Sequence, residues 1–127
     1  MKLNPNISVF FPCYNDSRSI GQLVIDSFST LKKITTKFEV IVIDDCSTDS
    51  SRKILEKLAT EYKKLKVIHH EKNKGYGGAL QSGFRNAVYE WIFYTDGDGQ
   101  YDVKKLPLLV ALTSDNVDFV NGIKIAR

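Results

Sequence analysis

The stretch Phe38-Glu39-Val40-Ile41-Val42-Ile43-Asp44-Asp45 joins a run of β-branched residues to two adjacent carboxylates. A run of this kind predicts a buried strand over Phe38–Ile43. Two carboxylates at the end of a buried strand are costly unless something pairs with them or binds to them. The pair therefore favours a ligand-binding site at the end of this strand. The structural alternative is that this segment caps the next helix through Ser47, Thr48 or Asp49.

Strand and helix patterns alternate on both sides of this stretch. Further strands are expected at Ile7–Phe11, Leu65–His69, Trp91–Thr95 and Val117–Val120. Apolar residues at helical spacing predict helices over Ile20–Leu31, Ile54–Tyr62, Ala79–Val88 and Val103–Val110. Alternating units of this length predict an α/β fold with a mainly parallel sheet and flanking helices. In such sheets the ligand binds beyond the carboxyl ends of the strands, where Pro12–Asp16 and the acidic clusters fall.

The composition is that of an ordinary globular protein. The chain has 127 residues and a formal net charge of +3, which is too weak to indicate a nucleic-acid partner. The sequence shows neither a signal-peptide pattern nor an apolar run of the ~18–20 residues that a membrane span needs. Cys13 and Cys46 are too few for a disulfide framework. We therefore expect one cytoplasmic domain over residues 1–127 with free thiols.

A glycine-spaced acidic cluster, Asp96-Gly97-Asp98-Gly99-Gln100, follows the fourth expected strand. Grouped oxygen ligands of this kind suit Mg²⁺ or Mn²⁺, and a polar turn that caps the next helix is the alternative. An EF-hand is excluded because Tyr101 stands where glycine is needed and Pro107 where glutamate is needed. An aspartyl-nucleophile phosphatase is also excluded, since its acidic pair follows the first strand.

A glycine-rich stretch, Lys72–Gly78, precedes the third expected helix. It matches neither the dinucleotide-binding fingerprint nor the P-loop pattern. Contact with a phosphate through backbone N–H groups and close packing of the helix both remain open. His69 and His70 lack a spaced partner, which favours a structural role over metal binding.

Four motifs resemble those of the inverting family-two glycosyltransferases, closest to the polyprenyl-phosphate (dolichol-phosphate-mannose-synthase-like) branch. They are Ser8–Asp16, Val40–Asp49, Asn73–Ala79 and Thr95–Gln100. Together they cover almost the whole chain in the order of that family. The resemblance implies a Rossmann-like nucleotide-sugar-binding domain of the GT-A fold that is truncated, because relatives continue into an acceptor-side part. The catalytic residues are therefore unknown.

The resemblance also implies roles for individual residues. The residues expected to contact the nucleotide-sugar are Pro12, Tyr14, Asp16, Ile43, Asp45, Asp96, Gly97 and Lys124. Asp98, with Asp96 and Gln100, would ligate Mg²⁺ or Mn²⁺. Asp16 replaces the family's more usual glutamate, which puts the length of its contact in doubt.

The implied activity is transfer of a sugar from a UDP- or GDP-linked donor to an acceptor, with inversion and metal assistance. In the branch it resembles, the acceptor is a polyprenyl phosphate at the membrane surface. The full-length protein is then expected to associate with the membrane, and an oligomer would cover surface left exposed. A non-catalytic nucleotide or nucleotide-sugar binding module is the alternative. A nucleotidyltransferase is more distant, because its glycine-rich loop should follow the first strand.

Overall fold

A computed structural model describes residues 5–97 and 102–110 of the chain. The strands are β1 (Ile7–Cys13), β2 (Phe38–Asp44), β3 (Leu65–His69) and β4 (Trp91–Tyr94). The helices are α1 (Ile20–Ile34), α2 (Ser51–Glu61), α3 (Gly75–Asn86), the 3-10 turn η1 (Val103–Lys105) and α4 (Leu106–Val110). The predicted alternation of strands and helices is confirmed over these ranges, and the strand expected at Val117–Val120 lies outside them.

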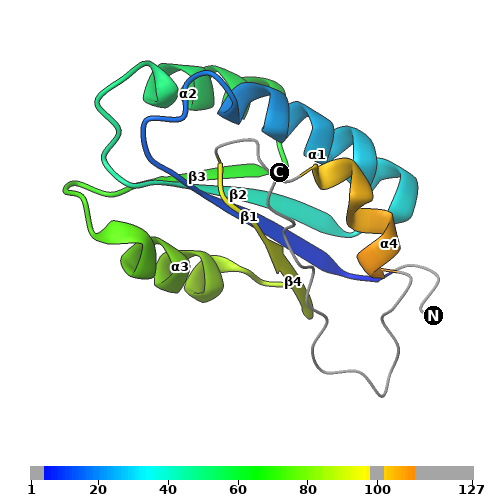
Figure 1. The fold of residues 1–127 in the computed structure, drawn as a ribbon. Helices are drawn as coiled ribbons and strands as arrows, with labels where there is room; N and C mark the ends of the chain where they lie inside the picture. Colours follow the sequence, from blue (N-terminus) through cyan, green and yellow to red (C-terminus); the bar gives the residue numbers. More distant parts are fainter. Residues whose placement is uncertain (1–4, 98–101, 111–127) are drawn as a thin grey trace.

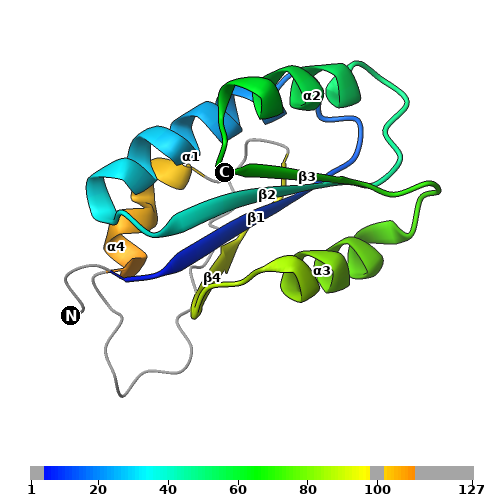
Figure 2. The ribbon, with the colours of Figure 1, turned by 180° about the vertical axis from the view of Figure 1, so that it is seen from behind.

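The four strands form one parallel sheet in the order β3-β2-β1-β4. Val9 of β1 lies opposite Val40 of β2 on one side and Phe93 of β4 on the other. Helices α1, α2 and α4 cover one face of the sheet, and α3 covers the other (Figure 1; Figure 2 shows the reverse side). Burial on both faces explains why β1 and β2 are almost continuously apolar.

Successive side chains of the central strands point to opposite faces of the sheet and belong to two separate cores. Val9 and Phe11 point into the larger core under α1, α2 and α4, while Phe10 and Ile41 point into the smaller core under α3. This division follows from the two-residue repeat of a strand. Both cores therefore fix the position of the strand ends that carry the polar clusters.

Helix α3 lies unusually close to the sheet at Gly83. A Cβ atom at this position would overlap the ring of Phe10, so glycine is required for the approach. The predicted apolar stripe over Ala79–Val88 is wrong at its end, because α3 stops at Asn86 and Val88 is 68% exposed in the connection to β4. Helical spacing cannot distinguish a buried stripe from apolar residues that continue past the end of the helix.

Strand β1 continues through Pro12 to Cys13, beyond the end expected at Phe11. Pro12 pairs in register with Ile43, and its carbonyl oxygen accepts a hydrogen bond from Gly97 N at 3.0 Å. The side of Pro12 that lacks an N–H therefore faces the segment beyond β4, which has ended at Tyr94. Proline is tolerated here because no ladder hydrogen bond is lost.

The two thiols have different surroundings. Cys13 is buried, Cys46 is partly buried, and both are free thiols, as predicted. Over the part of the chain that the structure describes, every helix is too short or too polar to cross a bilayer.

Candidate functional site

Four connections meet at the carboxyl edge of the sheet. The loops after β1, β2 and β3 gather at the left of Figure 1. Residues 95–97, which follow β4, join them through the hydrogen bond between Gly97 N and Pro12 O. The predicted convergence of the polar clusters on one edge is therefore present for the described residues.

The loop after β1 and the segment after β4 touch at Gly97. Besides its bond to Pro12, Gly97 accepts a 2.7 Å hydrogen bond at its carbonyl oxygen from Ser19 Oγ. A Cβ at Gly97 would lie 2.9 Å from Pro12 O and 3.2 Å from Asp16 Oδ2, which leaves little room for a side chain. Asp96 immediately precedes this contact, so the structure brings Pro12, Asp16, Asp96 and Gly97 together.

The carboxylate of Asp16 also shapes its own loop. Its Oδ2 accepts a 3.1 Å hydrogen bond from the backbone N–H of Tyr14, whose side chain is 49% exposed. This local bond turns the chain sharply after β1. Tyr14 is thus presented on the surface at the site edge, where an aromatic ring can pack against a ligand.

Asn15 fastens the loop after β1 to the loop after β2. Its φ of 53° lies in the left-handed region, and its Oδ1 accepts hydrogen bonds from Thr48 N at 2.7 Å and Asp49 N at 3.2 Å. Asn15 N donates to Ser47 Oγ at 3.0 Å. Sequence reasoning missed this role, although asparagine is among the few residues that tolerate such a φ.

Asp49 completes this loop-to-loop connection. Its carboxylate accepts hydrogen bonds from Ser17 N at 3.1 Å and from Ser51 N, at the start of α2, at 2.9 Å. Burial alone raises the pKa of Asp49, but the bonds from Ser51 and Ser17 outweigh it and lower the pKa to about 2. Asp49 thus binds the first N–H of α2, as the capping alternative expected of it, although Ser50 is the residue directly before the helix.

Asp44 and Asp45 are both buried and both paired inside the protein. Asp45 accepts hydrogen bonds from Lys74 N at 2.8 Å, Gly75 N at 2.9 Å and the His70 ring at 2.8 Å. Burial raises the pKa of Asp45, but the bonds from Lys74, His70 and Gly75 more than offset this, so the pKa lies below its usual value. These contacts account for the burial of Asp45 without a ligand, and its contact with a base stays a prediction.

Asp44 has a parallel set of partners. Its Oδ1 accepts from Ser47 N at 3.0 Å, and its Oδ2 lies 2.7 Å from His69 Nδ1. The structural role expected for the two histidines is thus confirmed, but their pairing with the two aspartates was not foreseen.

The glycine-rich stretch at the start of α3 contacts Asp45 through its backbone. Two of the backbone N–H groups near the start of α3, those of Lys74 and Gly75, donate to Asp45. Gly75 has a φ of +78°, which glycine adopts without strain. The positive φ therefore explains Gly75, close packing explains Gly83 later in the same helix, and the N–H groups of Lys74 and Gly75 are already bonded to Asp45.

The remaining predicted site residues have mixed outcomes. Ile43 is fully buried in the core under α3, and its contact with the nucleotide-sugar stays a prediction. Asp98, Gln100 and Lys124 lie outside the described residues. Within residues 5–97 and 102–110, no group of three or more histidine, cysteine or carboxylate side chains is arranged to hold a metal ion.

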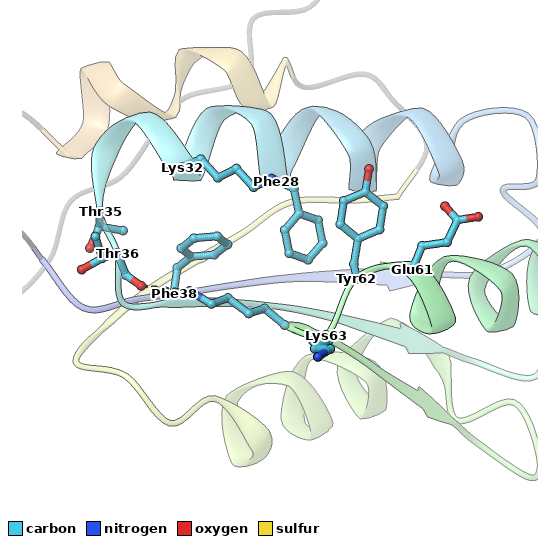
Figure 3. Close-up of a pocket in the computed structure, with 9 residues that line it drawn as sticks. Phe28, Lys32, Thr35, Thr36, Phe38, Glu61, Tyr62 and Lys63 are labelled. Carbon is cyan, nitrogen blue, oxygen red and sulfur yellow. Dashed lines mark hydrogen bonds between the residues drawn. The ribbon is translucent and has the colours of Figure 1, made fainter.

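A separate groove of about 390 Å³ lies at the opposite end of the sheet, between the ends of α1 and α2 and the start of β2 (Figure 3). The rings of Phe28 and Tyr62 stack there with centroids 4.5 Å apart. Lys64 Nζ lies 4.2 Å from the centroid of Phe38 and donates to Thr36 O. Lys64 is thus engaged with the groove's own wall, and the carboxylates of the site edge lie at the other end of the strands.

Comparison with known proteins identifies the family. The sequence model described as Glycosyl transferase family 2 matches residues 8–126. The chain belongs to this family. The undecaprenyl-phosphate 4-deoxy-4-formamido-L-arabinose transferase of Pectobacterium atrosepticum is 30% identical to this family-two chain over 123 residues. The match covers 96% of the chain but only 38% of that relative.

Solved structures of glycosyltransferases share the fold. TarS 1-349 of S. aureus superposes with a TM-score of 0.69 and 34% identity, over 84% of this chain and 31% of its own. The mannosyltransferase PcManGT of Pyrobaculum calidifontis, solved with GDP-Man and Mn²⁺, gives a TM-score of 0.77 at 24% identity, over 89% and 33% of the two chains. The predicted GT-A fold is therefore confirmed, and the chain spans about a third of these proteins.

Proposed function

We propose that this family-two chain is the donor-binding part of a transferase that moves a sugar from a UDP- or GDP-linked donor to a polyprenyl phosphate. The observation that carries the proposal is the contact of Gly97 with Pro12 and Asp16, which places Asp96 beside the loop after β1. The name of the Pectobacterium relative supports the acceptor class. A structure of TarS in complex with UDP and the GDP-mannose complex of PcManGT support the donor class.

Different site residues are proposed to contact different parts of the donor. Residues 12–16 and Asp45 surround the base and ribose, and Tyr14 offers a ring on which a base can stack. Lys124 would lie near the diphosphate. A lysine there supplies charge without the two-pronged geometry of the arginine that is common in the family.

Asp96, Asp98 and Gln100 are the residues proposed to hold Mg²⁺ or Mn²⁺. Their oxygen atoms suit a hard cation, and Asp96 stands next to the glycine that lies against the Asp16 carboxylate. When bound, such an ion neutralises negative charge that develops on the departing nucleoside diphosphate.

The proposed reaction is one displacement at the anomeric carbon. An oxygen of the acceptor phosphate forms the new bond from the face opposite the nucleoside diphosphate, whose bond to the sugar breaks. Inversion follows from this geometry. A phosphate acceptor is already anionic, so the reaction requires no protein base to deprotonate it.

Titration calorimetry with UDP and GDP, each with and without Mn²⁺, tests donor binding. We expect one of the two nucleotides to bind and the metal to tighten the binding. Absence of binding to both nucleotides under all conditions would contradict the proposal.

Sugar transfer to a polyprenyl phosphate tests the activity in a chain extended to the length of the relatives. We expect transfer by the extended chain and little or none by residues 1–127 alone. An extended chain that binds the donor but transfers nothing would point instead to a non-catalytic nucleotide-binding module.

A further inference from the structure

His70 links the carboxylate of Asp45 to the middle of α3. Its Nδ1 lies 2.8 Å from Asp45 Oδ1, and its Nε2 lies 2.8 Å from Ser82 Oγ. Asp45, His70 and Ser82 are 4%, 7% and 7% exposed, so water does not compete effectively for these bonds. The three side chains form a buried row from the end of β2 to α3.

Both ring nitrogens of His70 are therefore engaged. A neutral imidazole satisfies both contacts when Nδ1–H donates to the carboxylate and Nε2 accepts from the Ser82 hydroxyl. Because the two nitrogens lie at different corners of a planar ring, the two bonds fix its orientation. The backbone of His70 is held as well, since its N–H donates to Asp44 O at 2.9 Å.

Asp45 is in turn enclosed by the connection from β3 to α3. Lys74 N and Gly75 N donate to its two carboxylate oxygens, and Asn73 Nδ2 donates to its carbonyl oxygen at 3.2 Å. The backbone donors approach from the start of α3, whereas His70 approaches from the end of β3. His70 thus supplies the side-chain contact that restrains rotation of the carboxylate from that second direction.

We infer that His70 is a positioning residue, which holds the Asp45 carboxylate in the orientation that recognises the base of the donor nucleotide. The inference rests on the proposed function, in which Asp45 contacts the base. A carboxylate that is already restrained before the nucleotide binds loses less conformational freedom on binding. His70 itself does not need to touch the nucleotide.

The neighbouring pair of His69 and Asp44 provides a matched control. Its ring-to-carboxylate distance is 2.7 Å, and it also joins the ends of β3 and β2. The proposed function gives Asp44 no contact with the donor. Loss of this pair should loosen the same edge of the sheet without changing the group that reads the base.

The test measures the affinity for UDP and GDP by calorimetry with Mn²⁺ present, in His70→Phe, His70→Asn and His69→Phe. We expect His70→Phe to weaken nucleotide binding roughly tenfold, by analogy with metal sites, where loss of a hydrogen bond that supports a ligand costs about tenfold or more in affinity. His70→Asn should restore most of the affinity, because its amide N–H can replace the Nδ1 donor. His69→Phe should bind as the wild type does, and melting curves verify that each variant is folded.

Equal affinity in His70→Phe and the wild type, or an equal loss in His69→Phe, would overturn the role of His70 while leaving donor binding intact. Failure of the wild type to bind either nucleotide would instead contradict the proposed function, and the role of His70 with it. If His70→Phe does not fold, the ¹⁵N-labelled wild type decides. The Nδ1 signal of His70 should shift when nucleotide is added, and an unmoved signal at saturation would count against the role.

Discussion

His70 Nδ1 and Asp45 Oδ1 lie 2.8 Å apart, and the same carboxylate receives the N–H groups of Lys74 and Gly75 near the start of α3. Asp45, which directly follows β2, therefore joins the end of that strand to the end of β3 and the first turn of α3. A negative charge at the start of a helix is also favoured by the helix dipole. The structural role of Asp45 and its proposed ligand-binding role thus meet in one residue.

Asp45→Asn should lower the free energy of unfolding at neutral pH by about 1–3 kcal/mol, because an amide N–H₂ replaces an acceptor beside buried donors. The pKa of Asp45 is lowered in the folded state, so its stabilising effect is fully present above the usual value of 3.8 and is lost as the pH falls below it. Denaturant unfolding at pH 7 and pH 3 measures both effects. The difference between wild type and variant should shrink at pH 3, and a difference that is constant with pH would contradict this account.

Gly83→Ala should destabilise the protein by about 1–3 kcal/mol, because the added methyl group overlaps the Phe10 ring and must displace it. Gly77→Ala is the matched control on the same helix, where a Cβ meets open space. That variant should gain up to about 1 kcal/mol from helix propensity. Thermal or urea unfolding compares the two, and destabilisation by both variants would show that close approach to β1 is not the cause.

Asn15→Ala should lower stability by about 1–2 kcal/mol, because it removes the acceptor for two N–H groups of the neighbouring loop. The positive φ of residue 15 adds to the cost for alanine. Asn15→Asp retains an acceptor oxygen and tolerates the same φ, so it should keep most of the stability. If Asn15→Asp and Asn15→Ala lose stability equally, the side-chain acceptor is not what joins the loops.

The two thiols should differ in reactivity. Cys13 is 1% exposed, and burial, with the nearby charge of Asp16, raises its pKa to about 12, so it remains a protonated thiol at neutral pH. A maleimide or disulfide reagent should label Cys46 first in the native protein and both residues after denaturation. Mass spectrometry of the labelled peptides gives the order, and early labelling of Cys13 would contradict its burial.

Much of the fold follows from sequence patterns that depend on neighbouring residues. Short apolar runs located all four described strands, with Leu65–His69 matching β3 at both ends. The errors arose where distant contacts decide the outcome. Pro12 remains in β1 because its unbonded side faces the segment beyond the end of β4, and Val88 is exposed because α3 stops two residues earlier.

The site was predictable as a location but not as a set of contacts. The edge was expected from the acidic clusters, since carboxyl ends of parallel strands meet. The pairing of His70 with Asp45 spans 25 residues and follows from the register of β2 and β3, which sets Asp44 opposite His69. The bonds of Asn15 to Thr48 and Asp49 likewise depend on where two loops meet.

The most direct measurement is the effect of Mn²⁺ on nucleotide affinity in the wild type and in Asp98→Ala, determined by calorimetry with UDP and GDP. If the chain holds its donor through a metal at Asp96-Gly97-Asp98, Mn²⁺ should tighten binding in the wild type and have little effect in the variant. Equal stimulation by Mn²⁺ in both proteins, or binding that ignores the metal in both, would contradict the account.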